Sequence, residues 1–195
     1  MNLTRQQSAL KTRQKIVGAA FTIVGQAGYE ALTTNSLILE AGVAKGTLYH
    51  HFSNLDEVVY AMIEMILDQS LDDVPVEQFN SIEEYLDAIG DYIMTDFSQD
   101  PRVMNAVFGF LPKGMKDPFF RNAAKNMLEN ACNRIAPAIQ SFCAGRVSEE
   151  KLDNAIRIVD MFSAGFCIHY TIFDQPKKYR AIWQDFSKML AIYLE

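Results

Sequence analysis

Apolar side chains recur three and four positions apart along most of the chain, and this spacing limits the fold more than any other feature. Such a period places the apolar residues along one face of a helix, whereas a half-buried strand needs them at every second position. Proline and glycine fall between the periodic stretches, and no segment alternates convincingly. The sequence therefore predicts an all-α fold of about nine helices.

The composition is that of a soluble globular protein. Hydrophobic residues make up 49% of the 195 positions, which is enough to bury a core and excludes a chain that is disordered throughout. The three cysteines form no C-x-x-C pair, so neither a disulfide framework nor a structural zinc site is indicated, and a reducing cytoplasm fits. The first residues are polar, so we expect no signal peptide. The most apolar stretch, residues 158–173, contains Asp160 and His169, and we expect it to be too short and too polar to span a membrane.

Charge is divided unevenly along the chain. Residues 1–55 carry five Lys and Arg against two Glu, whereas residues 56–195 carry 13 basic and 22 acidic groups. A basic N-terminal segment followed by an acidic remainder, the basic head and acidic body of the chain, suggests that the N-terminal segment binds a polyanion. Chance variation in a short segment is the alternative that charge alone leaves open.

Residues 28–59 carry the pattern that points to a function. They contain two short helical stretches joined by a turn at residues 41–43, where Gly42 can adopt a left-handed backbone conformation at low cost. Four apolar residues are spaced to share a small core: Leu37, Val43, Leu48 and Phe52. Four others then point outward from the second helix: Lys45, Thr47, Tyr49 and His50. This is the pattern of a helix-turn-helix, whose second helix enters the major groove of DNA.

At this point the sequence resembles the TetR family of bacterial transcriptional regulators, over about residues 10–60. The most specific match is the run KGTLYHHF, residues 45–52. The further matches are Arg13-x-x-Ile16, Ala19-Ala20, Gly28-Tyr29, Leu32-Thr33 and Ala41-Gly42-Val43. The resemblance implies a helix-turn-helix DNA-binding domain over residues 1–55, followed by a helical ligand-binding and dimerisation domain over residues 56–195.

The resemblance also implies roles for individual residues. Thr33 or Thr34 would contact phosphate at the start of the first helix of the pair. Lys45 and Tyr49 would reach bases or phosphates, and three residues of the second helix would bind phosphate: Gly46, Thr47 and His50. Two departures from the family pattern weaken this assignment: Ala44 replaces a common capping Ser, and Leu55 stands where a Lys often binds phosphate. A protein-interaction module that has lost DNA binding is therefore one alternative.

The second domain is expected to form a homodimer. Residues 158–173 are apolar nearly all round and need cover on more than one side, and the last helix carries large aromatic residues on one face. Resemblance to the family implies that these two helices pair with their copies as a four-helix bundle, while burial inside one chain is the alternative. A symmetric dimer would read a roughly palindromic operator on successive major grooves.

The family couples DNA binding to a small molecule, so a ligand pocket is expected in the second domain. The candidates are apolar or aromatic residues with a few polar ones among them: Met62, Ile66, Phe97, Met104, Phe108, Met127, Phe162, Phe166, His169 and Tyr170. His169 and Tyr170 stand out because a buried polar tip needs a partner. The few basic residues favour a hydrophobic ligand that is neutral or cationic. For each apolar candidate, plain core packing is the alternative.

The sequence thus predicts a cytoplasmic, dimeric repressor that a small hydrophobic ligand releases from its operator. An activator or global regulator without a ligand is the alternative within the same class. An all-helical enzyme is the alternative from another class, but the chain has no H-E-x-x-H, no nucleophile elbow and no glycine-rich phosphate loop. We therefore expect no catalytic residue and no cofactor. We expect no metal site, because His50 and His51 are neighbours that point about 100° apart on a helix.

Overall fold

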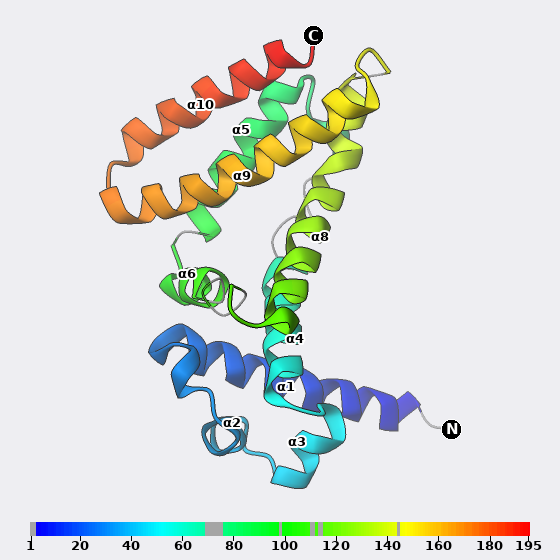
Figure 1. The fold of residues 1–195 in the computed structure, drawn as a ribbon, viewed down its shortest axis with the longest axis vertical. Helices are drawn as coiled ribbons and strands as arrows, with labels where there is room; N and C mark the ends of the chain where they lie inside the picture. The colour runs from blue at the N-terminus through cyan, green and yellow to red at the C-terminus, as the bar shows by residue number, and fades with distance from the viewer. Residues whose placement is uncertain (1–2, 69–75, 98, 110–111, 113–114, 144) are drawn as a thin grey trace. The chain divides into compact units, whose positions relative to one another are not determined.

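The computed structural model of the chain describes residues 3–68, 76–97, 99–109, 112, 115–143 and 145–195 (Figure 1). These residues contain nine α-helices and no strand. The all-α prediction is therefore confirmed. The helices are α1 (Leu3–Ala27), α2 (Thr34–Ala41), α3 (Lys45–His51), α4 (Leu55–Asp68), α5 (Ile82–Tyr92), α6 (Pro101–Phe108), α8 (Pro118–Cys143), α9 (Glu149–Phe173) and α10 (Pro176–Tyr193).

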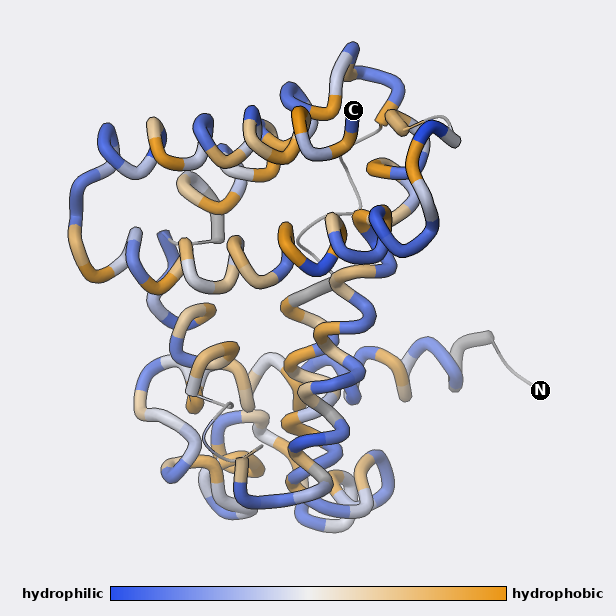
Figure 2. The backbone as a smooth tube through the Cα atoms, turned by 45° about the horizontal axis from the view of Figure 1, so that its top comes forward, coloured by the Kyte–Doolittle hydropathy of each residue, from blue (hydrophilic) through white to orange (hydrophobic). Residues whose placement is uncertain are grey.

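Local sequence signals set the ends of several helices. The side chains of Ser81 and Ser148 each accept a hydrogen bond from a backbone N–H three residues later, at the starts of α5 and α9. Prolines open three helices, α6, α8 and α10, because the fixed φ of proline suits the first helical position and its missing N–H costs nothing there. Along the helices, hydrophobic and hydrophilic positions are interleaved, as expected of helices that bury one face (Figure 2).

The chain divides into two compact units. One comprises residues 1–69 and 101–127, and the other comprises residues 70–100 and 128–195. In the first unit α1 packs against α2, α4 and α6. Its core residues lie on these helices and on α3, and they include Ile16, Ala20, Val24, Leu37, Leu48, Val58 and Met62.

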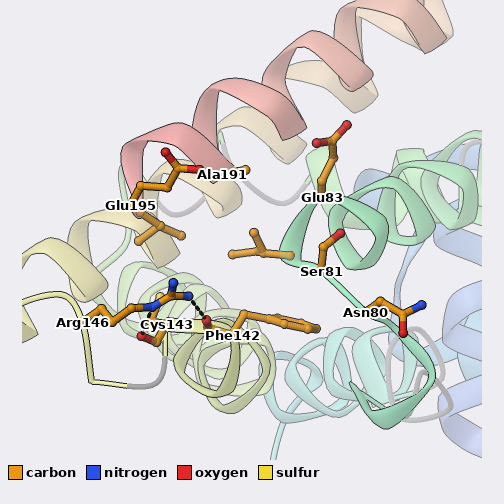
Figure 3. Close-up of a pocket in the computed structure, with 10 residues that line it drawn as sticks. Asn80, Ser81, Glu83, Phe142, Cys143, Arg146, Ala191 and Glu195 are labelled. Atoms are coloured by element: carbon orange, nitrogen blue, oxygen red, sulfur yellow. Dashed lines mark hydrogen bonds between the residues drawn. The ribbon is translucent and has the colours of Figure 1, made fainter.

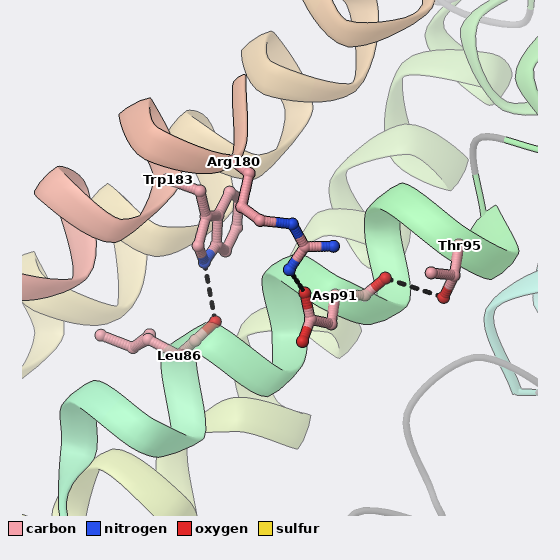
Figure 4. Close-up of polar contacts among 5 residues, drawn as sticks. All are labelled: Leu86, Asp91, Thr95, Arg180 and Trp183. Carbon is pink, nitrogen blue, oxygen red and sulfur yellow. Dashed lines mark hydrogen bonds and ion pairs between the residues drawn. The ribbon is translucent and has the colours of Figure 1, made fainter. Parts of the chain in front are cut away.

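The second unit is held together by α5, α9, α10 and the later part of α8. Trp183 of α10 is buried and its indole N–H donates to the carbonyl of Leu86 at 2.8 Å, which joins α10 to α5 (Figure 4). On the exposed side of the same helix pair, Arg180 forms an ion pair with Asp91. An aromatic cluster, formed by Phe162, Phe166, Trp183 and Phe186, fills the space between α9 and α10.

Helix α9 is longer than the apolar stretch recognised in the sequence, because it begins nine residues earlier, at Glu149. Among the described residues it is the one helix whose length and composition would suffice to cross a membrane, with a mean hydropathy of 1.2 over 18 residues. The stretch from 158 to 173 is itself only 16 residues long, so the expectation that it is too short and too polar to span a membrane stays a prediction. Only 22% of the residues in that window are fully buried within the chain, so the other residues of the window are at least partly exposed.

Candidate nucleic-acid interface

Helix α2 begins with a capping box. The side chain of Thr33 accepts a hydrogen bond from the Ser36 N–H at 3.1 Å, and the Ser36 hydroxyl accepts one from the Thr33 N–H at 2.9 Å. Two N–H groups that have no partner within the helix are satisfied in this way. The sequence analysis singled out Thr33 for DNA but did not give Ser36 its part in the cap.

The turn between α2 and α3 is made by Gly42 in the left-handed conformation, with φ 55° and ψ 45°. An L-residue with a side chain rarely adopts this conformation, so glycine is needed here. Helix α3 then begins at Lys45 after Ala44, which provides no side-chain cap, as the sequence predicted. The turn fixes the direction in which α3 leaves α2.

The inner faces of the two helices are buried as predicted. Leu37, Leu48 and Phe52 are each at most 3% exposed, whereas Val43 in the turn is half-buried. Arg13 of α1 lies over the ring of Phe52, with its guanidinium carbon 5.0 Å from the ring centre. The small core therefore holds α2 and α3 against α1.

The residues predicted to meet DNA lie on the outer side of this core. Lys45, Gly46, His50 and Tyr49 are exposed, and Tyr49 is exposed by 46%. The side-chain oxygens of Thr34 and Tyr49 are 3.3 Å apart, so the first residue of α2 and the middle of α3 present their side chains together. The remaining two predicted residues are Thr33, which is exposed, and Thr47, which is half-buried.

A further basic group lies beside the turn. A Cβ atom placed on Gly42 would be 3.4 Å from Nζ of Lys15, so the ammonium of this α1 residue lies at the joint of α2 and α3. The sequence analysis counted Lys15 only as part of the basic head. Its place next to the turn could not be read from local spacing, because residues 15 and 42 are brought together by the packing of α1 on α2.

Known proteins are similar to this unit in sequence and similar to the chain in fold. The family model described as "Bacterial regulatory proteins, tetR family" matches residues 16–62, from α1 into α4. The HTH-type transcriptional regulator UidR of Escherichia coli (strain K12) is 24% identical over 123 residues, which cover 62% of this chain and 61% of UidR. The solved structure of Salmonella enterica GusR is similar over 94% of this chain and 96% of that chain, with a TM-score of 0.76 and 16% identity.

Residues 16–62 carry the sequence of the TetR family, and the chain has the fold of the similar structures. Its helices α2 and α3 are the helix-turn-helix of that family, and α1 and α4 are the supports on either side in the sequence. The alignment spans less than two thirds of the length of UidR. A third similar protein, the multidrug binding protein EbrR complexed with ethidium, has a TM-score of 0.67 and 20% identity, and the match covers 92% of this chain and 98% of that chain.

Helix α6 is tied to α1, the helix that supports the helix-turn-helix. The side-chain amide of Asn105 donates to the carbonyl of Gly25 at 2.9 Å, and the hydroxyl of Tyr29 donates to the carbonyl of Ala106. Burial raises the pKa of Tyr29 well above its usual range, so the hydroxyl stays protonated and remains a donor. A Cβ on Gly25 would be 2.4 Å from Cβ of Arg102, which shows how closely the two helices approach.

The ten predicted ligand residues are divided between the two compact units. In the first unit Met62, Ile66 and Met127 are buried, and Met104 and Phe108 of α6 are half-buried. In the second unit Phe166 is buried, Phe162 and Tyr170 are half-buried, and the rings of Phe162 and Phe166 are 6.0 Å apart. The side chain of Phe97 lies outside the described residues.

The expected burial of His169 is wrong for the single chain. His169 is exposed near the end of α9, where its ring lies beside Phe173 and Tyr179 at 5.6 and 6.4 Å between centres. The sequence could not show this, because an apolar stretch does not reveal which of its sides a neighbouring helix covers. Because it is exposed, the side chain of His169 can still contact another molecule.

Cavities lined by described residues lie in both units, and neither of the two considered below is lined by a predicted ligand residue. The first has a volume of about 330 Å³ and lies in the second unit, between the start of α5 and the ends of α8 and α10 (Figure 3). Its side chains include Glu83 and Arg146, but Arg146 already donates to the backbone carbonyls of Phe142 and Cys143. The second has a volume of about 390 Å³ and lies in the first unit, against the end of α3.

Within the described part of the chain, no group of three or more His, Cys, Asp or Glu side chains could hold a metal ion. The rings of His50 and His51 meet edge to face at 5.3 Å between centres. All three cysteines are buried and free, and burial raises the pKa of Cys167 to about 12. These thiols therefore behave as small hydrophobic core residues.

Proposed function

We propose that the chain is a DNA-binding transcriptional regulator, most simply a homodimeric repressor that leaves a palindromic operator when a small hydrophobic ligand binds. The observation that carries the proposal is the helix-turn-helix itself, in which a buried inner face leaves Lys45, Gly46, Tyr49 and His50 exposed on α3. Residues 1–55 would act as the DNA-binding domain and residues 56–195 as the domain for ligand binding and dimerisation. Such a regulator acts in the cytoplasm, where the DNA is, and needs no catalytic residue.

Phosphate contacts supply most of the affinity in such a complex, and a few base contacts supply the sequence preference. Lys45 and Tyr49 are suited to either kind of contact because both are exposed on α3. Thr34 would bind phosphate from the start of α2, with its hydroxyl held near that of Tyr49. Lys15 adds a cation beside the turn, so α1 would contribute to backbone binding as well.

The exposed apolar residues of α9 and α10 support the dimer. Met161, Ile172, Met189 and Ile192 are each exposed by 62% or more. Exposed apolar residues on two neighbouring helices mark an interaction surface more often than a surface that contacts only solvent. A two-fold axis through this surface would place two copies of α3 on one face of the DNA.

The contacts of α6 support ligand release. This helix carries Met104 and Phe108 of the predicted ligand set, and Asn105 between them bonds to α1. A ligand that contacts α6 can therefore move the helix that holds the helix-turn-helix. The ligand shifts the equilibrium towards the released arrangement only if it binds that arrangement more tightly than the DNA-bound one.

The test is selection of bound duplexes from a random DNA pool, followed by affinity measurements on the winners at increasing salt. We expect the selected duplex, the winner, to be two-fold symmetric, and the affinity of the protein for it to fall steeply as the salt concentration rises. Lys45→Ala and Tyr49→Ala should each weaken binding to the winner by about tenfold or more, while Lys116→Ala, which removes an exposed charge outside the helix-turn-helix, should not. No enrichment by the folded protein at low salt, both as purified and after unfolding and refolding to strip any ligand, would contradict the proposal.

An activator or global regulator without a ligand is the second candidate. Transcription from a promoter that carries the selected operator separates the two. A repressor lowers the transcript and an activator raises it. A screen of hydrophobic neutral and cationic compounds against the operator complex then tests for a ligand.

A further inference from the structure

A second cavity lies beside the recognition helix rather than among the predicted ligand residues. It has a volume of about 390 Å³, within the range of small-molecule sites, and all of its walls belong to the first compact unit. His51 and Phe52 line it at the end of α3, Arg13 of α1 lines it beside them, and α4 and α8 supply the remaining walls.

The walls from α4 and α8 carry two carboxylates, one phenol and two carboxamides. Glu57, Tyr60 and Glu64 are spaced along one face of α4, and Asn122 and Asn126 are four positions apart on one face of α8. Within the described part of the chain, neither Glu57 nor Glu64 forms an ion pair. Their polar contacts are weaker than ion pairs: Glu57 accepts from the N–H of Ser53 at 2.8 Å, and Glu64 is hydrogen-bonded to Tyr60.

The arrangement fits a ligand with separated positive charges. Glu57 and Glu64 are seven positions apart on α4, which is about 10 Å along the helix axis at ~1.5 Å per residue. A single small cation cannot meet both carboxylates at that separation, whereas a linear chain with an ammonium group near each end can. The amide oxygens of Asn122 and Asn126 would accept further N–H groups of the same chain.

We propose that this cavity binds an aliphatic diamine or polyamine, with Glu57 and Glu64 each pairing with one ammonium group. This site is separate from the hydrophobic ligand of the proposed function and from the residues assigned to it. The guanidinium of Arg13 lies over the Phe52 ring at the same cavity and repels ammonium groups, so the ammonium groups of the ligand would pair with the carboxylates of α4.

An occupied cavity would alter the end of the recognition helix. A bound polyammonium competes with Arg13 for the space beside Phe52, and Phe52 belongs to the core that fixes α3 against α1. Polyamine binding and DNA binding would therefore be linked. This consequence rests on the proposed function, whereas the binding of the amine does not.

The deciding experiment is isothermal titration of the full chain, without DNA, with spermidine and with linear α,ω-diamines of increasing length. We expect saturable binding of about one amine per chain, strongest for the diamines long enough to span the two carboxylates and weakest for n-butylamine. Glu57→Gln with Glu64→Gln should weaken spermidine binding by about tenfold. Glutamine retains the oxygen that accepts from Ser53, so the start of α4 is preserved.

The matched control is Glu149→Gln with Glu150→Gln, which removes the same charge from the exposed first turn of α9. Asn126→Leu provides an independent variant from the α8 wall. The proposal holds if the α4 pair and Asn126→Leu weaken binding and the control pair does not. Equal weakening by the control pair, equal affinity for n-butylamine and the diamines, or no saturable binding of any amine overturns it. Because DNA is absent from this experiment, its result is independent of whether the chain recognises an operator.

Discussion

Gly90 of α5 lies directly beneath the indole ring of Trp183 on α10. A Cβ atom added to Gly90 would be 2.3 Å from Nε1 of that ring, a distance that real Cβ atoms do not tolerate. The same indole N–H donates to the carbonyl of Leu86, one helical turn earlier on α5 (Figure 4). The absent side chain at residue 90 is thus what allows the tryptophan to reach its acceptor.

Gly90→Ala should therefore destabilise the protein, although alanine is the better helix former. The added methyl group forces Trp183 or α10 to move, which costs about 1–3 kcal/mol in a packed core. Gly18→Ala is the matched control, because nothing lies within 4 Å of a Cβ at this α1 position. That variant should gain about 0.5–1 kcal/mol. Thermal unfolding of both variants checks the prediction, and equal effects in the two would contradict the packing argument.

Features that depend on near neighbours can be read from the sequence. Helix caps, helix starts and the turn all follow from residues within four positions of one another. The caps are Ser81 and Ser148, the helix starts are Pro101 and Pro118, and the turn is at Gly42. The exposed set on α3 follows in the same way, because helical spacing fixes which side chains share a face.

The features that were missed depend on residues distant in the chain. Asn105 is 80 positions from the carbonyl of Gly25 that it binds, and Trp183 is 97 positions from Leu86. No local period specifies such pairs. The exposure of His169 was missed for the same reason, since the position of α10 decides which side of α9 is covered.

Gly46 offers a test that separates DNA contact from folding. Nothing in the chain lies within 4 Å of a Cβ at this α3 position, so Gly46→Ala should leave stability unchanged or raise it by about 0.5–1 kcal/mol. If phosphate approaches the α3 backbone here, the added methyl group should weaken operator binding by several fold. Thermal unfolding and DNA titration of the same preparation provide the two measurements. Unchanged affinity would remove Gly46 from the interface.

Asp160 on α9 should make stability depend on pH. Burial raises the pKa of this carboxyl, an effect that the nearby Arg157 partly opposes. A raised pKa means that the folded protein holds the proton more tightly than the unfolded chain, so the folded state loses stability as pH rises from the unfolded to the folded pKa. Asp160→Asn removes this loss.

The variant should therefore unfold a few degrees higher than the parent at pH 7, and the difference should shrink as the pH falls, because protonation of the parent carboxyl removes the cost of its buried charge. Asp153→Asn on the same helix is the control, because Asp153 is exposed. The measurement is the unfolding temperature of the three proteins from pH 4 to pH 8. A difference that grows on acidification would show that the sign is wrong.

The exposed apolar surface of α9 and α10 should hold two chains together. Met161 and Ile172 are eleven positions apart on α9, which is three helical turns, and they are 65% and 68% exposed. In a two-fold interface each substitution is present twice, so Met161→Glu with Ile172→Glu would place four carboxylates in an apolar contact. Leu39→Glu is the control, since Leu39 is 83% exposed on α2, which belongs to the other compact unit. In light scattering we expect about twice the chain mass of 22.0 kDa for the parent and the control, and a shift to the single-chain mass for the double variant. A parent that scatters as a single chain at micromolar concentration would contradict the dimer, and the uncovered face of α9 would then need another partner.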